Sequence, residues 1–264
     1  MALRNITPEE TNRLCCLVYG RPGVGKTSLL RTLPEGARCC VASAESGLLS
    51  VNDLVESEAV TGVVIDTFDD FLELYDCLAN HEAWKEAYDW VFVDSLSEIA
   101  SQCVEKFLGK NPSNTIKAWG DYDTAMTRAI KGFRDLTDYH VVFTALDTVP
   151  AEAGRTPMVD VPGQKFSGRV TSYFNNVFYM AVEIEDGPRP KPKPKPLAKA
   201  GVGQERPAEE EPEPAVGRGG LRRVLLTDFT LVAHGKNRGG VLLPKEPPDL
   251  AAIMAKITQR KEQK

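Results

Sequence analysis

The feature that most constrains this chain is Gly-Arg-Pro-Gly-Val-Gly-Lys-Thr at residues 20–27, which fits the pattern G-x-x-x-x-G-K-T. An apolar run at 14–19 precedes it, and a helix-like segment at 28–33 follows and stops at Pro34. This strand–loop–helix context is what a phosphate-binding loop requires, because successive backbone N–H groups and a helix N-terminus then point at negative charge. The residues expected to bind the nucleotide are Gly20, Arg21, Pro22, Gly23, Val24, Gly25, Lys26, Thr27 and Ser28.

Two side chains of this loop have roles that follow from the motif. The ammonium group of Lys26 is expected to reach the β- and γ-phosphates, and the hydroxyl of Thr27 is expected to bind Mg²⁺. A glycine-rich turn that binds nothing is the alternative. With Gly at about 7% of residues, however, the four fixed positions match by chance in only about one chain in a hundred of this length. The sequence therefore predicts a nucleotide-binding protein with ATP and Mg²⁺ as cofactors.

Composition narrows the class of protein further. The chain has 264 residues, of which 42% are hydrophobic and 26% charged, so it can bury a full core as a globular protein. A net charge of −5 argues against a protein that coats nucleic acid with its whole surface. The six cysteines include no C-x-x-C pair, so neither a zinc site nor a disulfide framework is predicted. Without an apolar leader or an 18-residue apolar run, we expect a soluble, cytoplasmic protein with no membrane partner.

The hydrophobic pattern predicts an α/β fold with a doubly wound, mostly parallel sheet. Short Val-rich runs alternate with helical stripes, as in strands that are covered on both faces. One stripe follows Asp69 and Asp70, which favour a helix start, and another is closed by Gly109. The expected strands are 14–19, 39–43, 62–65, 90–93, 140–145, 177–184 and 221–227, and the helical stripes lie at 71–78, 96–107 and 122–133.

Residues 187–219 interrupt this alternation. They hold eight of the 18 prolines, including a Lys-Pro repeat at 191–196, and an acidic cluster follows. Such a segment buries too little apolar surface to offset the entropy of ordering it. We therefore expect one domain over residues 1–264 with a disordered insertion at 187–219. The basic half can contact nucleic acid, although a solvated hairpin loop is the favoured interpretation.

Two carboxylates are candidates for the chemistry at the phosphate loop. The apolar strand at 90–93 runs into Asp94, a pattern typical of a Walker B element, which places Asp94 near the Mg²⁺ bound by Thr27. Glu45 follows the second strand and can accept a proton from the attacking water or orient that water. Taken alone, a residue such as Glu45 is more often a charge at a helix N-terminus.

The segment 147–174 mixes cations with aromatic residues at the ligand-binding edge of the predicted sheet. Basic side chains can neutralise the phosphates of nucleic acid while aromatic rings stack on bases. We therefore predict DNA contact here, with an ordinary mobile loop as the alternative. The candidate DNA-binding residues are Arg155, Lys165, Phe166 and Arg169.

Lys236 and Arg238 lie two residues apart in a glycine-rich turn. Side chains at i and i+2 of an extended chain project on the same side, so both cations can reach one phosphate. An arginine supplied by a neighbouring subunit can stabilise transition-state charge. Two solvated loop cations are an equally weighted alternative, and a loop this late in the chain could also fold back over its own site.

Together these residues resemble the ATPase core of RecA-like recombinases. Residues 42–51 (ASAESGLLSV) resemble the strand that ends in the family's catalytic glutamate, which points to Glu45, and residues 94–98 resemble its Walker B edge. Lys236-x-Arg238 resembles the K-x-R element of RadA-type and replicative-helicase-type relatives, where those cations act on the ATP of a neighbouring subunit. More narrowly, the chain resembles the phage group of core-only Sak-type single-strand annealing proteins. That likeness rests on the runs WGDY (119–122), FRDL (133–136), VVFTAL (141–146) and DLxxI (249–253).

The resemblance implies an ATPase, weak or DNA-stimulated, that binds single-stranded DNA and promotes annealing or strand pairing in homologous recombination. It implies a homo-oligomer, ring or filament, with a single-strand-binding protein as a further partner and a host cytoplasm if the protein is phage-encoded. The fifth strand lacks the glutamine that senses the γ-phosphate in RecA itself, since Ala145-Leu146-Asp147 stands there. A nucleotide-dependent assembly or regulatory ATPase without DNA binding is the alternative. A small-molecule kinase is disfavoured because the sequence has no arginine-rich lid beyond Arg155–Arg169.

Overall fold

The computed structural model describes residues 13–45, 48–148, 156–184, 221–230 and 233–259. The chain divides into two units, residues 1–181 with 223–264, and residues 182–222. The second unit falls almost entirely outside the described residues, and so does the insertion expected at 187–219, whose disorder therefore stays a prediction. The first unit contains nearly all of the described helices and strands.

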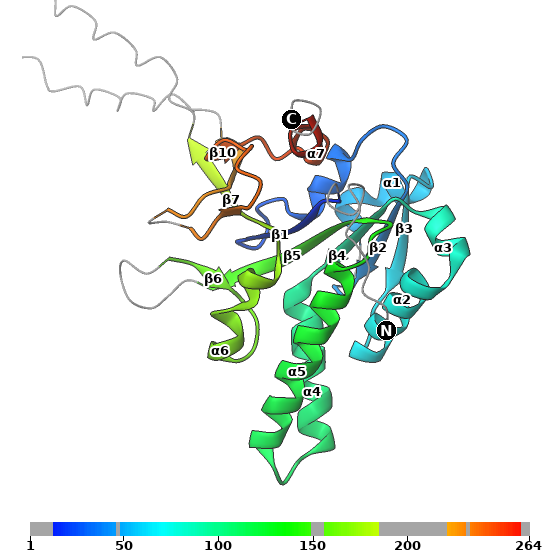
Figure 1. Ribbon diagram of the computed structural model, residues 1–264, viewed down its shortest axis with the longest axis vertical. Helices are drawn as coiled ribbons and strands as arrows, with labels where there is room; N and C mark the ends of the chain where they lie inside the picture. Colours follow the sequence, from blue (N-terminus) through cyan, green and yellow to red (C-terminus); the bar gives the residue numbers. More distant parts are fainter. Residues whose placement is uncertain (1–12, 46–47, 149–155, 185–220, 231–232, 260–264) are drawn as a thin grey trace, which may run out of the picture. The chain divides into compact units, whose positions relative to one another are not determined.

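The core is one mixed sheet whose central strands are all parallel, so the predicted α/β fold is confirmed (Figure 1). The strand order is β10-β8-β7-β1-β5-β4-β2-β3, with β6 paired to β5 and β9 paired to β7. The parallel pairs are β1 with β5 and β7, β4 with β5 and β2, and β2 with β3. The strands are β1 (Cys15–Gly20), β2 (Cys39–Ser43), β3 (Val60–Val64), β4 (Trp90–Asp94), β5 (His140–Thr148), β6 (Met158–Val159), β7 (Asn176–Ile184), β8 (Leu221–Leu226), β9 (Lys236–Asn237) and β10 (Lys245–Glu246).

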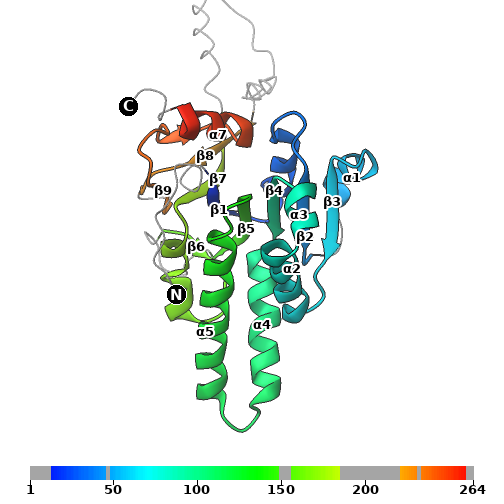
Figure 2. The ribbon, with the colours of Figure 1, turned by 45° about the vertical axis from the view of Figure 1, so that its right-hand side comes forward.

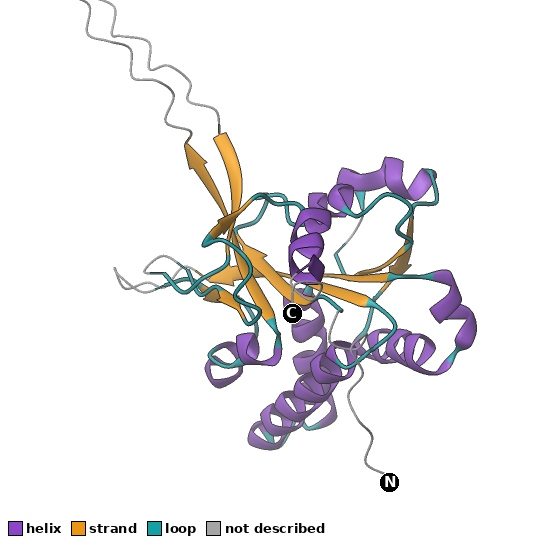
Figure 3. Ribbon diagram, turned by 45° about the horizontal axis from the view of Figure 1, so that its top comes forward, coloured by secondary structure: helices purple, strands orange, loops and turns teal. Residues whose placement is uncertain are grey.

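Helices cover both faces of this sheet, as expected for a doubly wound fold (Figure 3). The α-helices are α1 (Asn52–Glu56), α2 (Phe68–Asn80), α3 (Glu82–Ala87), α4 (Leu96–Lys110), α5 (Thr115–Arg134), α6 (Gln164–Ser167) and α7 (Leu250–Gln259). Three short 3₁₀ helices are η2 (Thr27–Thr32), η3 (Leu49–Val51) and η4 (Val170–Tyr173). Within the described part of the chain, none of the helices combines the length and apolarity needed to span a bilayer.

Strand β1 shows how the two faces are built. Leu17 packs in one apolar cluster with residues of α2, α4 and α5, whereas Val18 packs in a second cluster with residues of η2 and α7. Successive side chains of a strand point to opposite faces, so a strand covered on both sides is apolar at every position. This explains why the central strands read as continuous runs in the sequence. It also fixes β1, and therefore the loop that follows it, between two helical layers.

Local signals in the sequence explain where the helices begin. Helix α2 is capped by Thr67, whose hydroxyl accepts a hydrogen bond from the backbone N–H of Asp70, while the Asp70 carboxylate accepts one from the backbone N–H of Thr67. This reciprocal capping box satisfies two N–H groups that the helix leaves without partners. The helix start expected near Asp69 and Asp70 is thus confirmed. The segment after the phosphate loop differs from expectation, because it forms the 3₁₀ helix η2, which begins one residue earlier than predicted.

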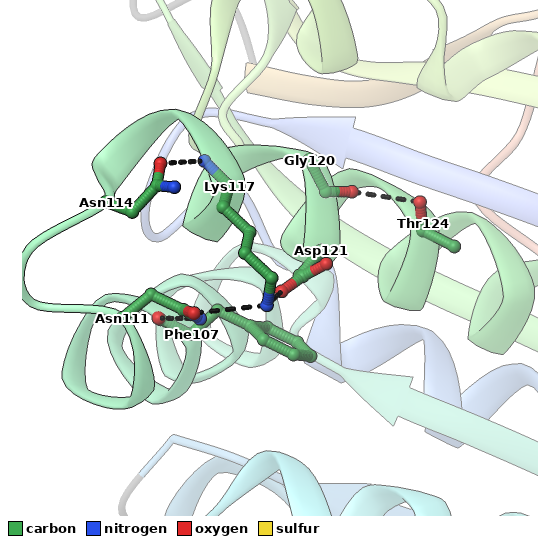
Figure 4. Close-up of polar contacts among 7 residues, drawn as sticks. All are labelled: Phe107, Asn111, Asn114, Lys117, Gly120, Asp121 and Thr124. Carbon is green, nitrogen blue, oxygen red and sulfur yellow. Dashed lines mark hydrogen bonds and ion pairs between the residues drawn. The ribbon is translucent and has the colours of Figure 1, made fainter.

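Helices α4 and α5 form a hairpin that extends away from the sheet (Figures 1 and 2). Its turn is held by polar side chains (Figure 4): Asn114 accepts a hydrogen bond from the backbone N–H of Lys117, and the Lys117 ammonium contacts Asn111 and Asp121. The Asn111 side chain in turn donates to the carbonyl of Phe107 at 3.1 Å. These contacts satisfy helix-end groups that would otherwise face only water.

Candidate nucleotide-binding site

The phosphate loop joins the carboxyl end of β1 to η2, and its glycines are required by its geometry. Gly23 and Gly25 have φ values of 72° and 105°, which lie in the region that glycine adopts without steric cost. Gly20 is needed for a different reason, since a Cβ there would lie 2.6 Å from the carbonyl oxygen of Met180 on β7. The loop can therefore turn sharply and still pack against the neighbouring strand.

Lys26 is held beneath the loop. Its side chain is 8% exposed, and its ammonium group donates to the carbonyl oxygens of Gly20 at 2.9 Å and Arg21 at 3.0 Å. Burial lowers the pKa of Lys26, and the carboxylates of Asp94 and Glu45 act in the opposite direction. The ammonium group is thus positioned at the loop that would cradle a phosphate.

Asp94 lies at the carboxyl end of β4, where it meets the threonine of the loop. The Thr27 hydroxyl donates to one Asp94 carboxylate oxygen at 2.7 Å, and the Thr144 hydroxyl on β5 donates to the other. Burial raises the pKa of Asp94, and the hydrogen bonds from these two hydroxyls partly offset that effect. This pairing is the arrangement that the sequence predicts for the metal ligands.

The donor set fits Mg²⁺. A carboxylate oxygen and a hydroxyl oxygen are hard ligands, and Mg²⁺ in nucleotide sites takes one or two protein ligands together with phosphates and waters. Among the described residues, there is no group of three or more His, Cys, Asp or Glu side chains placed to hold a metal by themselves. Thr27 and Asp94 can therefore hold Mg²⁺ as part of a Mg²⁺–nucleotide complex.

Glu45 lies in the loop after β2 and faces the same cleft. The Ser95 hydroxyl donates to a Glu45 carboxylate oxygen at 2.7 Å, so the first residue after Asp94 orients the carboxylate. A cleft of about 460 Å³ brings these groups together. It is lined by Pro22, Gly23, Gly25, Lys26, Thr27, Ser28, Glu45, Ser50, Asp94, Glu98 and Leu146. Glu45 thus lines the same cleft as the phosphate loop.

Thr144, Glu98 and Tyr179 also lie in this region, although the sequence did not predict a role for them. The only signal for Thr144 was a polar residue within the apolar run 141–146, and the side chain is fully buried against Asp94. Tyr179 on β7 donates to the Asp147 carboxylate at 3.0 Å and hydrogen-bonds Arg21 of the phosphate loop. Asp147, one of the residues that stand in place of a sensor glutamine, is thereby linked to the loop through Tyr179.

Lys236 and Arg238 do not line this cleft, because they lie on and just after β9. Strand β9 pairs with the start of β7, where Val177 is in register with Lys236 on one side and with Leu17 of β1 on the other. Lys236 donates to the carbonyl of Phe174 at 2.7 Å. The Arg238 guanidinium donates to the Asn175 side chain at 2.9 Å.

This position is at the amino end of the sheet. Asn237, between the two cations, is in register through Asn176 with Cys16. Four residues of strand, about 13 Å, then separate it from Gly20 at the start of the phosphate loop. The described structure therefore does not bring Lys236 or Arg238 to the phosphate loop of the same chain, which removes the fold-back alternative in this conformation.

The predicted DNA-binding residues are only partly available at the surface. Arg155 lies outside the described residues. The expectation that Phe166 stacks on a base is wrong, because this ring is 2% exposed and packs edge-on against Tyr122 in the core. The Arg169 guanidinium pairs with the carboxylate of Asp123, which neutralises its charge. Lys165 is exposed on α6, so it alone of the described candidates presents an unpaired charge to a ligand.

The fold and the site together define a P-loop nucleotide-binding core. Strand β1 of the sheet leads into the phosphate loop. The buried carboxylate of Asp94 on β4 accepts a hydrogen bond from Thr27 of that loop. The parallel sheet and the phosphate loop predicted from the sequence are thus present, whereas the likeness to Sak-type proteins stays a prediction. The family described as "AAA domain" matches residues 12–239, and the chain belongs to this family.

Solved structures that are similar to the chain include one of low sequence identity. It is the flagellar accessory protein FlaH from Methanocaldococcus jannaschii, with 11% identity and a TM-score of 0.44. The alignment covers 89% of this chain and 84% of that chain. No curated protein matches the sequence.

Proposed function

We propose that this chain is a Mg²⁺-dependent ATPase that binds single-stranded DNA and promotes annealing or strand pairing in homologous recombination. The observation that carries the ATPase part is the convergence of Lys26, Thr27, Asp94 and Glu45 on one cleft at the carboxyl edge of the sheet. A cation, a metal-ligand pair and a carboxylate able to handle water are the parts that hydrolysis of a phosphoanhydride needs.

Each of these residues has a defined task in that reaction. Backbone N–H groups of the loop hold the phosphates, and the Lys26 ammonium moves from the loop carbonyls to the β- and γ-phosphate oxygens. Thr27 and Asp94 would hold Mg²⁺, which would neutralise phosphate charge. Glu45, oriented by Ser95, accepts a proton from the attacking water or aligns it in line with the γ-phosphate.

The DNA-binding part of the proposal is supported by one surface of α5, α6 and η4. Trp119 is 41% exposed and lines a hollow with Lys165. A neighbouring hollow is lined by Arg128, Lys131 and Tyr173, and the Lys131 ammonium lies 5.4 Å from the centre of the Tyr173 ring. Such a surface suits single-stranded DNA, because cations can neutralise its phosphates while accessible rings stack on its bases. We assign to Trp119 the stacking role that Phe166, being buried, cannot fill.

The resemblance to Sak-type annealing proteins supports the recombination role, a cytoplasmic location and a single-strand-binding protein as partner. The position of Lys236 and Arg238, away from their own phosphate loop, supports a homo-oligomer in which they act on the ATP of a neighbouring subunit. In such an assembly these two cations stabilise the charge of the transition state in trans.

An ATPase assay with and without single-stranded DNA tests the proposal. We expect hydrolysis that needs Mg²⁺ and rises when single-stranded DNA is added. Hydrolysis that DNA does not affect, with no DNA binding, would favour the second function, an assembly or regulatory ATPase.

The binding surface is tested by the salt dependence of DNA affinity. Replacing Lys165 by Ala should flatten the slope of log affinity against log salt by about 0.7, since one phosphate contact is lost on single strands. Trp119→Ala should weaken binding at all salt concentrations. Lys85→Ala on α3, which removes one charge elsewhere that pairs with Glu82, is the control. If Lys165→Ala and Lys85→Ala behave alike, DNA binds another surface.

A further inference from the structure

Arg223 on β8 lies against the phosphate loop, although it is 198 residues after Gly25 in the chain. A Cβ built on Gly25 would be 3.1 Å from Nε of Arg223 and 3.3 Å from both Cδ and Cζ. The guanidinium therefore lies directly over the residue that precedes Lys26 and Thr27. It occupies the space that the missing side chain of Gly25 leaves open.

The alternation of β8 explains why this side chain reaches the loop. Leu225, two residues further on, packs in the same apolar cluster as Val24 and Leu29 of the loop and η2. Because residues i and i+2 of a strand share a face, Arg223 projects on the face that carries the phosphate loop. Arg222 projects on the opposite face.

Among the described residues, three cations surround the loop, and two of them are already engaged. Lys26 donates to the carbonyls of Gly20 and Arg21, and Arg21 hydrogen-bonds Tyr179. Arg223, in contrast, is exposed and has no hydrogen-bond or ion-pair partner within the described part of the chain. Its N–H donors are available to a ligand that arrives at the loop.

We propose that Arg223 binds the phosphate chain of the nucleotide held by its own subunit, as a second cationic contact beside Lys26. This inference rests on the proposed binding of ATP at the loop. Gly25 lies next to the two residues whose side chains meet phosphate and metal, so a group over Gly25 is at the phosphate end of the nucleotide. A planar guanidinium donates two parallel hydrogen bonds to phosphate oxygens, which an ammonium group cannot do.

The test compares nucleotide affinities of four proteins by titration calorimetry: the unsubstituted chain, Arg223→Ala, Arg223→Lys and the control Arg222→Ala. A hydrogen bond to a charged group corresponds to about a tenfold to hundredfold change in affinity. We expect Arg223→Ala to weaken binding of ATP and ADP by that factor and to change binding of AMP less than twofold. Arg223→Lys should retain part of the affinity, and Arg222→Ala should retain all of it.

Two results would overturn the assignment. Equal affinities of Arg223→Ala and Arg222→Ala for ATP would show that the guanidinium does not contact the nucleotide. An equal loss for ATP and AMP would place it on the nucleoside instead of the phosphate chain. If the unsubstituted chain itself binds no ATP, the proposed function fails first, so the two failures are distinguishable. Because Arg223 is exposed, its replacement leaves the core intact, and thermal unfolding of each variant checks this.

Discussion

Replacing Thr144 by Val tests whether Asp94 is held ready as a metal ligand by its neighbours. The Thr144 hydroxyl is fully buried and donates to one oxygen of the Asp94 carboxylate, while Thr27 serves the other oxygen. Val has nearly the same shape as Thr but cannot donate, so the substitution removes one hydrogen bond and leaves Asp94 in place. A hydrogen bond to a charged group stabilises it by about 1.5–3 kcal/mol.

That free energy converts directly into a change in the pKa of Asp94. The hydrogen bond from Thr144 lowers the pKa of Asp94, so Thr144→Val should raise the pKa of this carboxyl further. Because burial already raises this pKa in the folded chain, the folded state holds the proton more tightly than the unfolded state. The free energy of unfolding therefore falls as the pH rises from the pKa of Asp94 in the unfolded chain to its pKa in the folded chain. Because Thr144→Val raises the folded-state pKa, this fall continues to a higher pH in the variant.

Two measurements test this effect. The acidic limb of the pH dependence of Mg²⁺–ATP hydrolysis should shift to higher pH in Thr144→Val, because protonated Asp94 cannot bind the metal. Urea unfolding should show a loss of stability of about 1.5–3 kcal/mol at neutral pH, and a much smaller loss below the unfolded pKa. Thr124→Val is the control, since the Thr124 hydroxyl bonds only a helix carbonyl at 2.9 Å on an exposed surface (Figure 4). An acidic limb that is identical in both variants would refute the role of Thr144.

Three further outcomes are expected. Lys26→Ala should reduce ATP turnover by a factor corresponding to about 3 kcal/mol or more, since a positioned charge at the phosphates is lost; unchanged turnover in the folded variant would rule out the site. Glu45→Gln should keep ATP affinity in a binding titration but slow hydrolysis, whereas a normal rate would make Glu45 merely structural. Arg238→Ala mixed with Lys26→Ala should regain ATPase activity, because some interfaces then pair an intact loop with an intact arginine; no recovery in proven mixed assemblies would refute action in trans.

Several elements were predictable because their signals are local. The strand at 39–43 coincides with β2, since a parallel strand covered on both faces is apolar at every position. Helix α2 begins beside the expected acidic residues because a capping box involves residues only three apart. The strands β6, β9 and β10 were not predicted. Each has two residues and exists only because a longer strand lies beside it, so no periodicity marks them.

The positions of Phe166 and Arg169 show why composition alone does not identify a binding surface. The local sequence of a phenylalanine beside a lysine is the same whether the ring stacks on a base or packs in the core. The outcome was decided by α5, because Tyr122 covers the Phe166 ring and Asp123 pairs with the Arg169 guanidinium. Both partners come from more than 40 positions earlier in the chain, which a pattern in residues 147–174 cannot contain.

The phosphate loop was determined by the sequence alone. The groups expected to bind phosphate lie in eight consecutive residues. The motif itself contains the glycines that allow the positive φ values at positions 23 and 25. Tertiary structure decided which groups meet that loop. Thr27 is 67 residues from Asp94, Thr144 is 50 residues from it, and Arg223 comes from β8, which lies between β10 and β7 in the sheet. Such contacts depend on strand order and on which face each side chain takes, and both are set only when the sheet forms.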